Sequence, residues 1–405
     1  MRRLALLIPP ALALLVVGIV LVPGLTPTTA DEVSKSRALV DERTLEAVEA
    51  GFRFLVRTQN PDGSWSSNAG KKINERYRVF DGGRGVHHVG VTSLGILAFL
   101  AGGHIPGRGP YGDVLDKAVD FVMGQVQDAG YIASNRTRMY SHAFATLALA
   151  EVYGVTPHEN LRDRLQAAVE FTVRCQNETG GWRYVPFTKD SDMSVTVCQV
   201  VALRAARNVG IKVPRSTINR ALHYVIMSAN TESPGRGGRG WPRGSFLYQP
   251  YTQQYNRDSF SLTAAGLTTL FQAGLYDDRS LARYVTENSI DKHPPPSLDA
   301  ITRYMRRMYR QMPPHHRNHY FYWYGNYYAM QAMYQIGGQQ PEVWADWYRQ
   351  VRDDILQRQV TDPGQPKELR EGWWLSIVDE TNAYATASAL LILQFPLDQL
   401  PIHQR

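Results

Sequence analysis

Apolar residues recur along the chain at helical spacing and on one side only. In 45–56, 115–126, 161–173 and 218–229 they fall every three or four residues, with polar residues between them. This spacing places the apolar side chains on one face of a helix. We therefore predict an amphipathic helix in each of these segments, with its polar face toward solvent.

A second kind of segment follows each of these helices and is apolar nearly all round. It is rich in small residues and ends shortly before a glycine, the usual residue just past a helix end. The series is 94–100 before Gly102, 147–150 before Gly154, 201–206 before Gly210, 267–271 before Gly274, 329–334 before Gly337, and 387–391. We expect these segments to be helices buried on every side.

The alternation of the two kinds of helix predicts the fold class. A one-sided helix belongs on the outside of a structure, and an all-round apolar helix belongs inside it. Alternating β-branched runs closed by Asn-Gly turns, which would predict strands, are absent from the sequence. We predict an all-α (α/α)6 toroid, a barrel of six helical hairpins; an open superhelix of the same hairpins is the alternative.

The N-terminal residues have the pattern of an export signal. Two arginines precede an apolar run over 4–25, and 28–30 provide small residues for cleavage. The run is also long enough to span a bilayer, so an uncleaved membrane anchor is the alternative. We divide the chain into a signal peptide or anchor, 1–30, and a single toroid domain, 31–405, which we expect to be periplasmic or extracellular.

Composition narrows the possible partners. The formal net charge of +7 is spread over 405 residues without a basic stripe, so we predict no nucleic-acid partner. The two cysteines, Cys175 and Cys198, exclude a disulfide framework and leave open whether they form one bridge.

A Gln, Gly and Trp pattern appears at the ends of two predicted outer helices. It reads QNPDGSW at 59–65 and QNETGGW at 176–182, with weaker copies at 127–131, 238–241 and 372–374. The pattern resembles the repeat of squalene cyclases and protein prenyltransferases. The resemblance implies the terpenoid cyclase-like α/α toroid, and we interpret these Gln and Trp residues as locks that hold its helices together.

The catalytic motifs of these relatives are incomplete here. The resemblance aligns the cyclase motif Asp-x-Asp-Asp-Thr with 192–196, where Ser194 occupies the acid position. A hydroxyl group does not protonate an alkene at biological pH. The Asp-x-Cys zinc pair of the prenyltransferases is also missing, because Val173 and Thr196 stand two positions before the cysteines.

Loops that lead into the inner helices gather round one mouth of such a ring. The stretch 319–328 is the most unusual of them, because its tyrosines and tryptophan suit the wall of a partly hydrated cavity. A helix that fills the barrel and leaves no cavity explains the same residues equally well. The predicted ligand-binding residues are His88, His142, Ser194, Thr196, His319, Tyr320, Tyr322, Trp323, Tyr324 and Tyr384.

These observations predict an exported toroid that binds a hydrophobic or ring-shaped small ligand, or a protein partner, at its mouth. The first alternative is an enzyme of the terpene cyclase and prenyltransferase superfamily, with Asp192 or Asp258 as a non-standard catalytic acid. A hydrolase or lyase acting on a polysaccharide is the second, since a fold alone does not choose a reaction. We predict no cofactor and no metal site, because His88, His142 and His319 form no tight local motif.

One further segment carries unusual charge. Arg303, Arg306, Arg307 and Arg310 fall on one predicted helix. They are able to hold an anionic group, although the same spacing fits a solvated helix face.

Overall fold

The computed structural model describes residues 30–69, 85–134, 137–232, 241–252, 257–288, 290 and 293–403. Within these ranges the regular structure is helical apart from two short antiparallel pairs of strands. They are β1 (Ser66–Ser67) with β2 (Val86–His87), and β3 (Val360–Thr361) with β4 (Gly372–Trp373). Two-residue strands are too short to produce an alternating pattern, which is why the sequence did not predict them.

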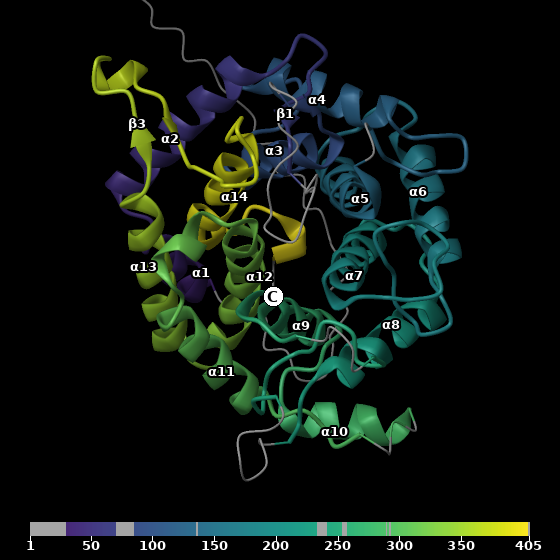
Figure 1. Ribbon diagram of the computed structural model, residues 1–405. Coiled ribbons are helices and arrows are strands. Elements are labelled where there is room, and N and C mark those ends of the chain that lie inside the picture. Colours follow the sequence, from purple (N-terminus) through teal and green to yellow (C-terminus); the bar gives the residue numbers. More distant parts are fainter. Residues whose placement is uncertain are drawn as a thin grey trace, which may run out of the picture.

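Six helices form a closed inner ring in the part of the chain that the structure describes (Figure 1). They are α3 (Val89–Ala101), α5 (Arg138–Val155), α7 (Met193–Asn208), α9 (Phe260–Gln272), α12 (Tyr320–Gly337) and α14 (Ala383–Leu393). Each contacts the next, and α14 contacts α3. The predicted (α/α)6 toroid is therefore confirmed, and the open superhelix is not formed.

An outer layer surrounds this ring. It consists of α2 (Glu42–Thr58), α4 (Gly112–Gly124), α6 (Leu161–Cys175), α8 (Arg215–Ser228), α11 (Leu298–Arg310) and α13 (Pro341–Leu356). The outer helices bury one stripe, as Leu115, Val119 and Val122 do in α4, whereas every residue of α3 is buried. Two further helices, α1 (Ala30–Arg37) and α10 (Asp278–Glu287), lie outside the alternation.

A repeated hydrogen bond joins the preceding loop to the first turns of five of the six inner helices. A backbone N–H in the loop donates to a side chain of the helix over 3.0–3.2 Å. The pairs are Trp65 with Thr92, Ile132 with His142, Trp182 with Thr196, Phe246 with Thr263, and Trp374 with Thr386. The three indole N–H groups also donate to carbonyls of the preceding outer helices at 2.8 Å. These buried aromatic residues therefore fix both helices of a hairpin.

A glycine two positions before four of these residues (Trp65, Ile132, Trp182 and Phe246) joins one hairpin to the next. Gly63, Gly130, Gly180 and Gly244 have φ between +85° and +88°. A Cβ atom at these positions would lie 2.1–2.3 Å from a backbone carbonyl oxygen of the following outer helix. Only glycine fits, because both the backbone conformation and the contact exclude a side chain.

The predicted glutamine locks contact the same helices. The Gln59 side chain donates to the carbonyl oxygens of Gly63 at 3.0 Å and Val114 at 2.8 Å. Gln176 makes the matching pair of bonds to Gly180 and Thr217. Their interpretation as locks is supported by these bonds, which span the boundary between neighbouring hairpins.

The weaker sequence copies are placed differently from the prediction. The backbone N–H of Gln127 donates to the carbonyl of Tyr131, just as the backbone N–H of Asn60 donates to the carbonyl of Ser64. Gln127 therefore corresponds to Asn60 and not to Gln59. In the fourth hairpin Gly244 and Phe246 make the contacts of this repeat. The predicted copy at 238–241 is therefore wrong. Of that copy, only Trp241 lies among the described residues. The long insertion before Gly244 hid the true copy.

The C-terminal segment packs against the inner ring. It contains η3 (Phe395–Leu397) and η4 (Pro401–His403), and η4 contacts α5 and α7. The Ile402 N–H donates to Glu151, which is 2 % exposed, and burial raises the pKa of that carboxyl from 4.5 to about 8. Glu151 is therefore largely protonated at neutral pH in the folded chain.

The predicted export segment lies outside the described residues except for Ala30. Among the helices that the structure does describe, none is both long and apolar enough to cross a bilayer.

The glycine contacts predict a position-specific cost. Gly63→Ala should lower the free energy of unfolding by about 2–4 kcal/mol, because the new methyl group meets the carbonyl of Lys117. Gly210→Ala is the matched control, with φ +84° and no neighbouring atom within 4 Å, and should cost only about 1–2 kcal/mol. Urea unfolding measures both, and equal losses would contradict the contact.

Glu151→Gln should stabilise the protein in a pH-dependent way. The folded state holds the Glu151 proton more tightly than the unfolded state does. The contribution of protonated Glu151 to the free energy of unfolding is therefore complete below pH 4.5 and is lost as the pH rises to about 8. At pH 7 the variant should gain about 2 kcal/mol, because glutamine carries no charge to bury. Near pH 4 the gain in the free energy of unfolding should vanish. Thermal unfolding of both proteins at pH 4 and pH 7 tests this. A gain that does not depend on pH would contradict the prediction.

Candidate functional site at the mouth of the ring

The N-terminal ends of the inner helices lie together at one end of the toroid. An outer helix returns the chain between consecutive inner helices, so the inner helices run in the same direction. Several begin with a side-chain cap, in which Asp192, Ser259 or His319 accepts a backbone N–H of the first turn. Polar side chains are thereby concentrated at this end.

Asp192 caps α7 at this end and is completely buried. Its Oδ1 accepts the hydroxyl of Ser194 at 2.6 Å and the N–H of Val195 at 3.0 Å. Its Oδ2 has no hydrogen-bond partner among the described residues, and the Nε of Arg183 lies 4.0 Å away. Burial raises the pKa of Asp192, against the opposing effect of these bonds and of Arg183. The proton of the neutral acid therefore belongs on Oδ2.

Ser194 links three inner helices. Its hydroxyl hydrogen is donated to Asp192, so Tyr140 of α5 donates to the Ser194 oxygen over 2.6 Å. Tyr324 of α12 donates to the Ser194 carbonyl over 2.9 Å. Below this level the hydroxyl of Tyr328 donates to the thiol of Cys198 over 3.2 Å. Tyrosines of α12 thus reach across the ring to α7.

Two more tyrosines extend the group from the loops. Tyr184 and Tyr248 are hydrogen-bonded through their hydroxyls, and the Tyr184 ring lies 5.8 Å from that of Tyr140. The Arg183 guanidinium lies 5.2 Å from the Tyr184 ring centre, and that of Arg257 lies 4.4 Å from the Tyr248 ring centre. Such cation–π contacts hold positive charge close to the buried carboxyl.

We call Tyr140, Tyr184, Asp192, Ser194, Tyr248 and Tyr324 the mouth cluster. Tyr140, Tyr184 and Tyr324 keep part of their surface accessible, as does Tyr384 at the start of α14. Burial raises the pKa of each of these tyrosines, so their hydroxyls stay neutral hydrogen-bonding groups. The cluster therefore presents neutral hydroxyls and aromatic rings around one protonatable acid.

Among the predicted site residues, only Asp192, Ser194 and Tyr324 belong to the mouth cluster. The imidazole of His142 is buried, accepts the N–H of Ile132 and lies 2.8 Å from the Thr172 hydroxyl, and burial lowers its pKa to about 3. His88 and His319 are buried helix caps, and Thr196 accepts the N–H of Trp182. These side chains bind neighbouring parts of the chain.

The remaining predicted residues point elsewhere. Asp258 accepts the hydroxyl of Tyr304 on α11 at 2.6 Å, and Tyr322 donates to Asp354 on α13 at 2.6 Å. Trp323 is 1 % exposed within the helix packing, and the side chain of Tyr320 is not among those described. The aromatic stretch is therefore largely packing, and Tyr324 alone of these residues carries its hydroxyl to the mouth cluster.

Tyr184, Tyr248 and Arg183 did not emerge from the sequence as site residues, although the repeat contains a signal for them. Tyr184 stands two positions after Trp182, and Tyr248 stands two positions after Phe246. The backbone carbonyls of both tyrosines accept the N–H of a neighbouring inner-helix residue, Met139 and Met193 respectively. A residue two positions after the lock therefore lies at the mouth.

The cysteines and acids give no metal centre within the described ranges. Cys175 and Cys198 are buried free thiols, which answers the question of a bridge between them. No group of three His, Cys, Asp or Glu side chains in these ranges is placed to share a metal ion.

Comparisons with known proteins place the fold. No family model and no curated protein matches the sequence. An inactive variant of an α-1,6-mannanase from a Salegentibacter species, in complex with α-1,6-mannotriose, superposes with a TM-score of 0.54 at 9 % identity, over 88 % of this chain and 99 % of its own. Cellobiose 2-epimerase from Spirochaeta thermophila gives 0.54 at 12 % identity, over 90 % and 98 %.

A type II terpene cyclase from Scytonema is also similar, with a TM-score of 0.46 at 11 % identity over 91 % of this chain and 98 % of its own. Identities this low describe the fold and leave the activity undefined. With its closed inner ring and its outer layer, the chain is an (α/α)6 toroid of the kind that these enzymes share.

Proposed function

We propose that the protein binds an uncharged, ring-shaped ligand rich in hydroxyl groups, of the sugar type, at the mouth cluster. From the predicted export segment we expect this binding to take place outside the cytoplasm. The observation that carries the proposal is the set of partly accessible tyrosines Tyr140, Tyr184 and Tyr324, which come from different elements. Tyr140 and Tyr324 both donate to Ser194, and the ring of Tyr184, whose hydroxyl is bonded to Tyr248, lies 5.8 Å from that of Tyr140.

The chemistry of these side chains selects the ligand class. A tyrosine ring packs against the apolar face of a sugar, while its hydroxyl exchanges hydrogen bonds with the sugar hydroxyls. A hydrocarbon ligand at the same place would shield these hydroxyls from water and leave unused the hydrogen-bonding capacity that remains beyond their bonds within the chain, which costs free energy. Arg183 already lies 3.1 Å from Asp190 and 4.0 Å from Asp192, so its charge is met within the chain and a neutral ligand suits the cluster.

Removing one hydroxyl tests this proposal. Tyr140→Phe should weaken binding of a neutral sugar about fivefold to tenfold, the effect of one lost hydrogen bond. The matched control is Tyr153→Phe, which alters another half-buried tyrosine of the same helix α5 and should leave binding unchanged. Isothermal titration calorimetry with a panel of neutral mono- and oligosaccharides provides the measurement.

The result that contradicts the proposal is equally specific. If none of the sugars raises the melting temperature or releases heat, or if both tyrosine variants weaken binding alike, the mouth cluster is not a sugar site. Circular dichroism of each variant shows whether the fold is retained.

Asp192 supports a second candidate, in which the protein also cleaves or rearranges its ligand with this residue as general acid. The supporting observation is a buried carboxyl with a raised pKa whose Oδ2 lacks a partner among the described residues. A general acid needs a proton that it retains until the reaction. Asp192 is completely buried, so in this candidate the ligand would first displace a side chain that covers it, and the proton would then pass from Oδ2 to a ligand oxygen.

Asp192→Asn separates catalysis from binding, because the amide preserves the hydrogen bonds at Oδ1 but donates no acid proton. Product formation from neutral oligosaccharides should fall at least about 100-fold, while binding persists. The wild-type rate should decline as the pH rises through the raised pKa of Asp192, since the acid form is then lost. Chromatography of the products is the assay, and wild-type protein that binds sugar without yielding product would exclude this candidate.

A further inference from the structure

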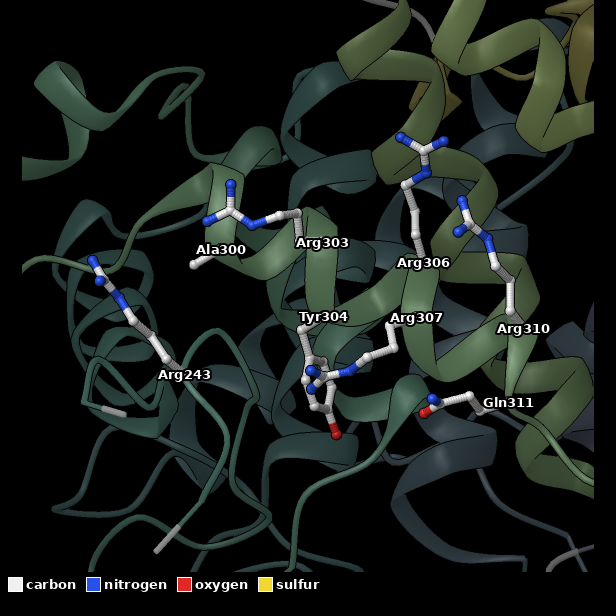
Figure 2. Close-up of a pocket in the computed structure, with 8 residues that line it drawn as sticks. All are labelled: Arg243, Ala300, Arg303, Tyr304, Arg306, Arg307, Arg310 and Gln311. Atoms are coloured by element: carbon white, nitrogen blue, oxygen red, sulfur yellow. The ribbon is translucent and has the colours of Figure 1, made fainter. Parts of the chain in front are cut away.

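A basic groove lies on the outer layer and shares no residue with the mouth cluster. It has a volume of about 550 Å³ and is lined by α11 and by Arg243 of the loop between α8 and α9. Figure 2 shows the arrangement of these side chains. The lining residues are Arg243, Ala300, Arg303, Tyr304, Arg306, Arg307, Arg310 and Gln311.

The arginines of this groove differ in their partners. Arg303 forms an ion pair with Asp299, and the Arg307 guanidinium lies 5.5 Å from the Tyr304 ring centre. Within the described ranges, no acidic side chain forms an ion pair with Arg243, Arg306 or Arg310. Three cations in one groove therefore keep their hydrogen-bond donors for another molecule.

The spacing on α11 brings like charges together. Arg306 and Arg310 are four residues apart, which makes them neighbours on the helix surface, and Figure 2 shows their guanidinium groups turned the same way. Like charges at this spacing destabilise a helix. No Asp or Glu belongs to the described lining of the groove, so the charges of Arg306 and Arg310 are available to a bound anion.

The arginines also define the length of the site. Positions 303, 306, 307 and 310 form one stripe, which extends along the helix for about 10 Å at the usual rise per residue. Arg243 adds a cation across from α11 (Figure 2). Guanidinium groups bind tetrahedral oxyanions through paired N–H donors. An extended ligand with several such groups fits this stripe better than a single small ion.

We propose that this groove is a binding site for a linear chain of phosphate or sulfate groups, either a short polyphosphate or a sulfated sugar chain. The Arg306 and Arg310 guanidiniums form the primary clamp, and Arg243 contacts the far end of the ligand. Tyr304 forms the floor, where its hydroxyl donates to Asp258 over 2.6 Å. The site shares no residue with the mouth cluster, so it stands independently of the proposed sugar binding.

The test uses the full chain with tripolyphosphate and with a sulfated oligosaccharide, measured by calorimetry at low and high ionic strength. Wild-type protein should bind at least one of these probes more tightly than orthophosphate, and binding should weaken as salt is added. The double variant Arg306→Gln/Arg310→Gln should weaken binding at least about tenfold. Whichever probe binds more tightly identifies the source of the oxyanions.

The matched control removes the same charge elsewhere. Arg43→Gln/Arg207→Gln alters exposed arginines of α2 and α7 and should leave the affinity unchanged. Arg306→Lys/Arg310→Lys should give an intermediate affinity, because lysine keeps the charge without the paired donors. The proposal is overturned if neither probe binds more tightly than orthophosphate, or if the control variant weakens binding as much as the groove variant.

Discussion

The structure depends on a contact, repeated in four loops, between a glycine and a backbone carbonyl oxygen of the next outer helix. At Gly63, Gly130, Gly180 and Gly244 the backbone occupies the left-handed region, and no room remains for a side chain. The backbone N–H of the residue two positions after each glycine then donates to a side chain of the next inner helix. One short loop thus fixes three helices, and repetition of this geometry closes the ring, as in other repeat architectures where each unit binds its neighbours.

The same geometry creates the mouth cluster. Once the loops are fixed, the residues two positions after Trp182 and Phe246 lie beside the N-terminal ends of the inner helices, where Tyr184 and Tyr248 pack around Asp192. Folding therefore buries a carboxyl whose charged form is disfavoured and surrounds it with hydroxyls and guanidiniums. A buried acid costs stability, and such costs are typical of sites that bind or react.

Much of the fold was predictable because its signals are local. Helical periodicity, the glycines past the inner helices and two complete Gln, Gly and Trp copies were sufficient for the toroid. The copy at Gly244 was missed because an insertion separates it from its helix, and His142 resembled a ligand residue although it replaces a lock threonine. The mouth cluster was only partly predictable, because contacts such as that of Tyr324 with Ser194 join residues far apart in sequence. The sequence also does not reveal which aspartate is buried away from water. Asp192 is completely buried, whereas Asp258 accepts the Tyr304 hydroxyl on the side of the outer helix.

We propose that the mouth cluster holds a neutral, hydroxyl-rich ring compound, whereas the sequence resemblance alone would suggest an isoprenoid. Native mass spectrometry of the purified full chain, with the ligands that copurify with it, tests this claim most directly. We predict a complex whose added mass is that of one carbohydrate and which is weakened by Tyr140→Phe. A bound isoprenoid in its place, released by the same substitution, would contradict the account.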